Sequence, residues 1–334
     1  MLSENIVNQI GDLIKNNQKF LLHFHPNPDP DSVGSALATA LALKGLGKEV
    51  TVIGGDSPLP DFLEYLPGKE LVVAKNYFDL DLNNFEVFLI LDSGGLDRVS
   101  RKGEVVFPAH LRTVVIDHHV SNPGFAEINI VDASYPATCQ ILFDLFIAWQ
   151  IVITADIAKN LFLGIYTDTG GFSHDNVSAD TLAVAAALAK IAPDFPKTLF
   201  NLMNNDEPQT LVYEKLMLNS LEPVCGGKAA IVGIDQDTLV KNNITANHIH
   251  RNMANRVIAI KKFNIGVMLV GLLPGEIKVS FRTRDSKRFD VSKIAAALGG
   301  GGHKGAAAAN VPGTLAEVKT KVSALLPELY PELA

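Results

Sequence analysis

The stretch that decides the fold is FLLHFHPNPDPDSVGSALATALALKGLG, residues 20–47. Residues 20–25 are mostly apolar and predict a buried β-strand, and GSALATALALKGLG (34–47) predicts the helix that follows it. Between them lies a loop, residues 26–33, with three prolines and two aspartates, and His25 ends the strand just before it. A strand followed directly by a helix is typical of α/β proteins, whose strands run parallel.

Further apolar runs and helical patterns continue this alternation over residues 48–53, 86–92, 112–117, 138–150 and 155–168. The continuous apolar runs predict an α/β domain with a parallel sheet covered by helices. His25, Asp92 and Asp117 each end one of the runs. Because ligands of open α/β sheets bind beyond the carboxyl ends of the strands, we expect these side chains to meet at one edge.

Length and composition exclude several classes of protein. The chain has 334 residues, enough for about two domains. It has no apolar run of the roughly 18 residues that a membrane span needs. Its first 20 residues predict an amphipathic helix and not a signal peptide. Two distant cysteines favour a reducing compartment, the cytoplasm, and the net charge of −7 confines any site for nucleotides to a local basic patch.

The character of the sequence changes over residues 192–222, which carry prolines and polar turns and predict a linker. The linker separates a first domain, residues 1–191, from a smaller α/β domain, residues 223–334. The second domain is predicted to contain a strand over 228–235, a hairpin over 265–284 turned at Pro274-Gly275, a helix over 290–299 and a closing amphipathic helix.

Four segments of the first domain carry residues suited to metal chemistry. They are HPNPDPD with His25, Asp29 and Asp31, LILDSGG with Asp92, TVVIDHH with Asp117, His118 and His119, and GIYTDTGG with Asp168. Each alone has an ordinary explanation, since aspartates cap helices and hold turns. Together, their buried charges would repel one another unless cations neutralise them.

Two divalent cations about 3.5–4 Å apart would neutralise this cluster, activate a water molecule and hold a phosphoryl group. A mixed nitrogen and oxygen donor set suits Mn²⁺ or a similar ion better than Ca²⁺. The four segments therefore predict metal-dependent phosphoester hydrolysis.

The second domain carries a basic, glycine-rich region. SFRTRDSKRF (280–289) supplies four cationic side chains, and GGGGHKG (299–305) supplies backbone N–H groups that can approach a phosphate closely. A basic hairpin end is often only a solvated surface. In an acidic chain, this patch is nevertheless where we expect an anionic substrate to bind.

Taken in order, the four acidic segments resemble those of the DHH phosphoesterase superfamily, and Asp117-His118-His119 matches its namesake motif. The SFRTR and GGGGHKGAA blocks resemble the DHH-associated C-terminal domain, and the two resemblances cover nearly the whole chain. The length and layout are similar to the two-domain bifunctional nanoRNases. Family II inorganic pyrophosphatases lack the glycine-histidine block, RecJ-type exonucleases are longer, and membrane-bound cyclic-dinucleotide phosphodiesterases carry additional segments.

The resemblance implies hydrolysis of short RNA oligonucleotides to mononucleotides and dephosphorylation of 3′-phosphoadenosine 5′-phosphate. It implies two Mn²⁺ ions, with Mg²⁺ or Co²⁺ as substitutes. The implied ligands are His25, Asp29 and Asp92 for one ion, and Asp31, Asp92, His118 and Asp168 for the other. Asp92, Asp117 and His119 take catalytic roles, with Asp117 orienting the histidine pair and His119 facing the scissile phosphate. The implied substrate-binding residues are Ser280, Arg282, Gly300, Gly301, Gly302 and His303.

Ala308 stands where the family commonly has glycine, so a left-handed backbone there would cost about 1 kcal/mol. Two other functions stay open: a single-strand DNA exonuclease or linear dinucleotide (pApA/pGpG) hydrolase, and a nucleotide-binding regulatory module without catalysis. The expected partners are short oligoribonucleotides and the bisphosphate nucleotide, with no membrane. The resemblance is compatible with a homodimer.

Overall fold

The first unit is built on a parallel sheet. The computed structural model describes residues 2–249 and 253–333, and the chain divides into two units, residues 1–204 and 205–334. The strands of the first unit are β1 (Lys19–His23), β2 (Glu49–Ile53), β3 (Val72–Val73), β4 (Val87–Leu91), β5 (Arg112–Asp117) and β6 (Ile128–Val131). All pair in parallel, in the order β3-β2-β1-β4-β5-β6. The direction of winding reverses between β1 and β4, the place where such sheets bind ligands.

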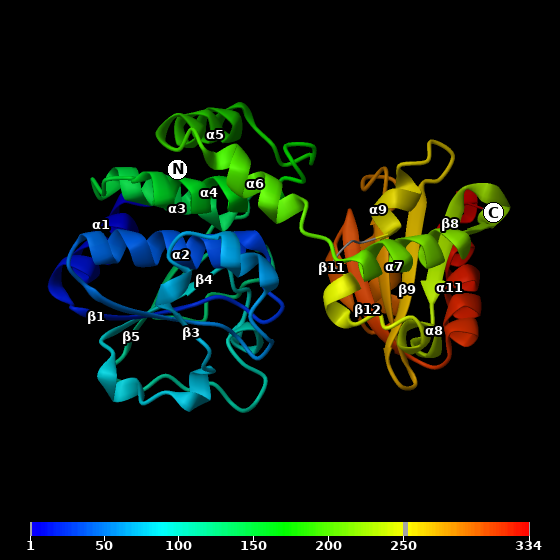
Figure 1. Ribbon diagram of the computed structural model, residues 1–334, viewed down its shortest axis with the longest axis horizontal. Helices are drawn as coiled ribbons and strands as arrows, with labels where there is room; N and C mark the ends of the chain where they lie inside the picture. The colour runs from blue at the N-terminus through cyan, green and yellow to red at the C-terminus, as the bar shows by residue number, and fades with distance from the viewer. Residues whose placement is uncertain (1, 250–252, 334) are drawn as a thin grey trace. The chain divides into compact units, whose positions relative to one another are not determined.

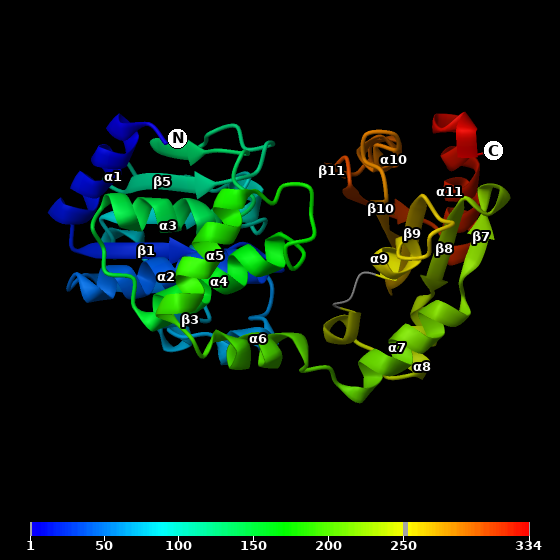
Figure 2. The same ribbon diagram turned by 90° about the horizontal axis from the view of Figure 1, so that it is seen from above.

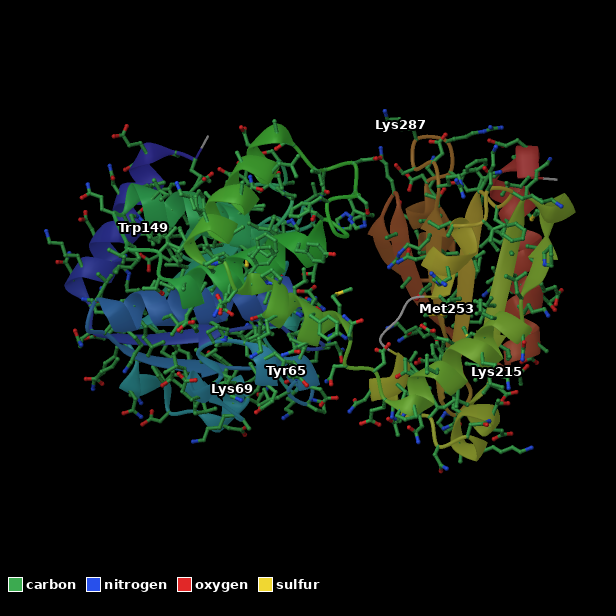
Figure 3. All side chains as sticks on the ribbon, turned by 45° about the horizontal axis from the view of Figure 1, so that its top comes forward. Tyr65, Lys69, Trp149, Lys215, Met253 and Lys287 are labelled. Carbon is green, nitrogen blue, oxygen red and sulfur yellow. The ribbon has the colours of Figure 1, made fainter. Side chains whose placement is uncertain are left out.

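Five α-helices lie on one side of this sheet, with α5 packed on α3 and α4 rather than on the strands (Figure 1). They are α1 (Glu4–Asn16), α2 (Pro30–Gly45), α3 (Thr138–Ala148), α4 (Ala155–Asp168) and α5 (Ala179–Ile191). Phe20 and Leu22 of β1 point into this helical layer and are fully buried. Trp149, labelled in Figure 3, donates its indole N–H to the carbonyl of Val7 at 2.9 Å and so ties the end of α3 to α1.

The other face of the sheet is covered by irregular chain with short 3₁₀ turns. Leu21 of β1 and Phe88 of β4 pack there against Tyr77, Val99 and Val105. The prediction of a parallel sheet covered by helices is confirmed, with the α-helices on one face and irregular chain on the other. Between β2 and β5 the described helical elements are short 3₁₀ turns, and apolar side chains of these connections, such as Tyr77 and Val99, pack on the strands.

Helix α2 begins four residues before the predicted Gly34. Asp29 is its N-cap and accepts from the backbone N–H of Ser32 at 2.9 Å, and Pro30 occupies the first turn. Proline fits there because its missing N–H would have no partner in the helix. Asp31 thus lies inside the first turn and is fully buried, while the Asp29 side chain stays half-exposed.

Residues 192–222, predicted as a linker, contain two helices instead. They are α6 (Phe195–Met203) in the first unit and α7 (Pro208–Asn219) in the second. Pro196 and Pro208 lie in the first turns of these helices, where proline starts a helix rather than breaking it. Tyr213 and Met217 of α7 are fully buried in the core of the second unit.

The second unit is a mixed sheet with helices on both faces. Its strands are β7 (Glu222–Val224), β8 (Ala229–Ile234), β9 (Ile265–Leu273), β10 (Glu276–Thr283), β11 (Gly301–His303) and β12 (Ala306–Pro312), in the order β11-β12-β10-β9-β8-β7. Its remaining helices are α8 (Gln236–Lys241), α9 (Met253–Ile258), α10 (Val291–Ala297) and α11 (Leu315–Leu329). Figure 2 shows α11 and α7 against this sheet.

Several elements of the second unit match their predicted positions. The hairpin turns between β9 and β10 at Pro274-Gly275, and Asp290 caps α10 through the N–H of Ser292. Gly299 follows α10 with a left-handed backbone, φ 81°. Within the described residues, none of the helices is both long and apolar enough to cross a membrane.

Candidate metal centre

The predicted metal-binding residues of the first unit meet at the carboxyl ends of β1, β4 and β5. His25 follows β1, Asp92 follows β4, and Asp117 ends β5. Asp168 arrives from the last turn of α4. Three sets of side chains place their donor atoms within 4.8 Å of one another: His25, Asp29 and Asp92; Asp31, His118 and Asp168; and Asp92, His118 and His119.

Asp92 is the central carboxylate. Its Oδ2 lies 3.4 Å from Nε2 of His25, and its Oδ1 lies 3.5 Å from Nε2 of His118. The side chain is almost fully buried, and the backbone is left-handed, with φ 51°. Because one oxygen of Asp92 faces His25 and the other faces His118, Asp92 is placed to serve the set of each histidine.

The rings of His25 and His118 are held in the same way. Nδ1 of His25 bonds to the carbonyl of Pro26 at 3.0 Å, and Nδ1 of His118 bonds to the carbonyl of Tyr135 at 3.3 Å. A carbonyl only accepts, so each Nδ1 carries a proton, and in the neutral ring each Nε2 keeps its lone pair. Metal-ligating imidazoles commonly use this tautomer, held by an outer partner.

His119 is oriented differently. Its Nδ1 bonds to Oδ1 of Asp117 at 2.7 Å, and Oδ2 of the same carboxylate accepts from the amide of Asn122 at 2.7 Å. Asp117 is fully buried, whereas the His119 side chain is 28% exposed. The carboxylate of Asp117 fixes the orientation of the His119 ring, an arrangement found both at catalytic imidazoles and at metal-ligating ones.

The cluster is strongly negative. Within residues 2–249 and 253–333, the ion pairs of these aspartates are with histidines only, and none is with lysine or arginine. Burial and the charges of Asp92 and Asp168 raise the pKa of Asp31 well above its ordinary value. Burial would lower the pKa of His118, but the hydrogen bond to Asp168 and the nearby carboxylates outweigh it and raise that pKa to about 10. The negative electrostatic potential that causes these pKa shifts also attracts cations.

In the second unit, four of the predicted substrate-binding residues share one face of the sheet: Ser280, Arg282, Gly301 and His303. Across β10, β12 and β11, Ser280 pairs with Ala308 and Ala308 with Gly301, and Arg282 pairs with Ala306 and Ala306 with His303. Directly paired residues of neighbouring strands place their side chains on the same face. Only alanines therefore separate Arg282 and Ser280 from His303 and Gly301.

Two glycines of the run are required by packing. A Cβ on Gly300 would lie 2.1 Å from the carbonyl oxygen of Ala308, and one on Gly302 would lie 2.6 Å from that of Ala306. A Cβ on Gly301 would meet nothing within 4 Å. Ala308 itself lies in β12 outside the left-handed region, so the predicted cost of alanine there does not arise.

Gly300→Ala and Gly301→Ala are therefore expected to differ. Gly300→Ala should lower the free energy of unfolding by about 1–3 kcal/mol because β11 must move away from β12. Gly301→Ala should keep the stability of the parent and raise KM for a nucleotide, because its methyl group would share the face of Arg282. Urea unfolding and KM measured on both variants test this, and equal stability losses would contradict it.

The chain matches known families over most of its length. The model of the DHH family, N-terminal domain, matches residues 19–165, and the model of the DHHA1 domain matches residues 226–329. The bifunctional oligoribonuclease and PAP phosphatase NrnA of Thermus thermophilus is 32% identical over 294 residues, covering 86% of this chain and 83% of that protein. The chain belongs to the DHH family.

Further relatives of this DHH protein agree. The bifunctional oligoribonuclease and PAP phosphatase NrnA of Bacillus subtilis is 25% identical, over 87% of this chain and 88% of that protein. The crystal structure of an exopolyphosphatase-related protein from Bacteroides fragilis superposes with a TM-score of 0.87 at 23% identity, covering 99% of this chain and 98% of that one. The superposition on the Bacteroides fragilis protein shows that the two proteins share one fold.

Some residues of this DHH site were not predicted from the sequence. Thr138 donates its hydroxyl to Asp92 at 3.0 Å, and Asn122 bonds Asp117. The Ser32 hydroxyl accepts from the backbone N–H of His25 at 3.1 Å. Asn122 and Ser32 lie next to predicted ligands in the chain, whereas Thr138 lies in an unrelated segment without a chemical signal.

Proposed function

We propose that this chain is a dinuclear-metal-dependent phosphoesterase. It hydrolyses short RNA oligonucleotides to mononucleotides and dephosphorylates 3′-phosphoadenosine 5′-phosphate to AMP. The observation that carries the proposal is the cluster of aspartates and histidines at the sheet edge, centred on Asp92. The names of the relatives, bifunctional oligoribonuclease and PAP phosphatase, support this choice of substrates.

The donor set fits two divalent cations. His25, Asp29 and Asp92 would hold one ion, and Asp31, Asp92, His118 and Asp168 the other, with Asp92 shared. Nitrogen and oxygen donors together favour Mn²⁺, with Mg²⁺ or Co²⁺ as substitutes. When bound, the ions supply Lewis-acid chemistry, which neutralises phosphoryl charge and lowers the pKa of water.

The residues of the chain divide the remaining work. Asp117, held by Asn122, fixes the ring of His119 through the 2.7 Å bond to its Nδ1. In this orientation His119 can face the scissile phosphate and donate or accept a proton there. Asp117 stays buried and acts only through the histidine, as carboxylates behind a catalytic imidazole commonly do.

The second unit would bind the nucleotide. Arg282 is half-buried, and its guanidinium donates to its own strand at the carbonyl of Phe281, 2.9 Å away. Within the described ranges, no carboxylate forms an ion pair with it. A half-buried guanidinium without a carboxylate partner is suited to a phosphate, which it can bind through two hydrogen bonds. Ser280, His303 and the backbone of Gly300–Gly302 complete the proposed face.

An activity panel tests the function. The full chain is incubated with Mn²⁺, Mg²⁺ or Co²⁺ and with a diribonucleotide, a long oligoribonucleotide, the deoxy counterparts and 3′-phosphoadenosine 5′-phosphate. We expect mononucleotides from the diribonucleotide and phosphate from the bisphosphate, with Mn²⁺ the most effective. Preference for the long deoxy strand would indicate a DNA exonuclease, and binding without product under every metal would indicate a regulatory module.

We place this activity in the cytoplasm. Both cysteines are unpaired, as is usual for proteins of a reducing compartment. A homodimer remains compatible with the family.

A further inference from the structure

Helix α3 begins without a cap of its own. Its N-cap position is Ala137, a residue that offers no side-chain acceptor to the first N–H groups of a helix. Those N–H groups are bonded to Asp31, which lies 107 residues earlier in the chain. The N–H of Thr138 donates to Oδ2 at 2.7 Å, and the N–H of Cys139 donates to Oδ1 at 3.0 Å. Asp31 therefore caps α3 from another element.

Thr138 also bonds the second central carboxylate. Its hydroxyl donates to Oδ1 of Asp92 at 3.0 Å, and the whole residue is inaccessible to solvent. A single residue thus contacts the aspartate from the end of β4 through its side chain and the aspartate from α2 through its backbone. Each carboxylate oxygen has two acceptor sites, so both aspartates keep sites for a cation.

This contact matters because Asp92 follows its strand with a left-handed backbone. Its side chain therefore does not continue the alternation of β4, and its direction depends on the groups around it. Among these, His25 and His118 would themselves bind cations, whereas the Thr138 hydroxyl would bind Asp92 whether cations are present or absent.

We propose that Thr138 is a positioning residue that sets the separation of Asp92 and Asp31 and thereby the separation of the two cations. The inference rests on the proposed metal function and adds a residue that none of the predicted ligand sets contains. Partners that orient a metal ligand from outside commonly contribute about 10- to 100-fold in metal affinity.

The test compares three variants of the full chain. Thr138→Val removes the hydroxyl with little change of shape, and Thr138→Ser keeps a hydroxyl on the same backbone. Thr39→Val is the matched control, because Thr39 is also a buried helical threonine whose hydroxyl bonds a backbone carbonyl, that of Ser35, at 2.8 Å. Mn²⁺ binding to each metal-free protein is measured by calorimetry, and folding by thermal unfolding in chelator.

We expect Thr138→Val to bind Mn²⁺ about 10- to 100-fold more weakly, and Thr138→Ser and Thr39→Val to bind it as the parent does. If a folded Thr138→Val variant binds Mn²⁺ with the affinity and stoichiometry of the parent, the inference about Thr138 is overturned and the proposed function is not. Absence of Mn²⁺ binding in the parent would instead overturn the proposed function. Should Thr138→Val not fold, Thr138→Ala gives the same comparison, and parental binding by Thr138→Ala overturns the inference equally.

Discussion

Replacing Asp92 with asparagine is expected to abolish tight binding of both Mn²⁺ ions and to reduce phosphate release from 3′-phosphoadenosine 5′-phosphate by on the order of 10³-fold. Asp92 is the carboxylate whose two oxygens face His25 on one side and His118 on the other, at 3.4 and 3.5 Å. Losing its charge removes a ligand from both proposed sites. A loss of about 4 kcal/mol of transition-state stabilisation corresponds to that factor.

Asparagine is the informative replacement because of the backbone at this position. Asp92 has φ 51°, and asparagine tolerates that conformation, whereas alanine would add strain unrelated to the chemistry. The amide also keeps the shape of the carboxylate and can still accept the hydroxyl hydrogen of Thr138. A folded variant without metal is therefore the expected outcome.

Asp97→Asn is the matched control. Asp97 lies five residues further along, its side chain is 63% exposed, and it pairs with Arg101 at 3.1 Å. Exposed pairs of this kind contribute little to stability, so we expect parental metal binding and activity. Two Mn²⁺ ions bound by Asp92→Asn with full phosphatase activity would contradict the dinuclear centre.

The site residues that could be predicted are those that lie at the ends of apolar runs in the sequence. Asp117 could be placed because the strand RTVVID ends at that residue, and β5 ends there in the structure. Parallel strands bring their carboxyl ends together, so the gathering of His25, Asp92 and Asp117 followed without knowledge of the loops.

The parts that could not be predicted depend on contacts between distant segments. Nothing near Thr138 in the sequence distinguishes it from other threonines, and its role appears only once α3 is packed against Asp31 and Asp92. The start of α2 and the two helices over residues 192–222 were not predicted, for a different reason. Proline indicates a turn as readily as the first turn of a helix, and only tertiary packing decides between them.

Replacing Arg282 with glutamine is expected to raise KM for 3′-phosphoadenosine 5′-phosphate by about 10- to 100-fold while the number of Mn²⁺ ions bound stays the same. Hydrogen bonds to charged groups contribute about 1.5–3 kcal/mol each, which sets this range. Burial lowers the pKa of Arg282, yet a guanidinium stays charged in proteins, so the parent presents a cation that lacks a carboxylate partner among the described residues. The metal centre lies in the other unit and keeps all its ligands.

Lys278→Gln is the control for Arg282→Gln. Lys278 lies on β10 as well, four residues earlier and on the same face, and it is exposed. Removing its positive charge changes the net charge of the chain by the same amount, so a general loss of attraction for anions would weaken both variants alike. A specific phosphate contact predicts that only Arg282→Gln raises KM, and that Arg282→Lys, which keeps the charge without the planar pair of donors, recovers only part of the affinity. Equal KM values for the Arg282 and Lys278 variants would show that the second unit attracts the substrate only by its general charge.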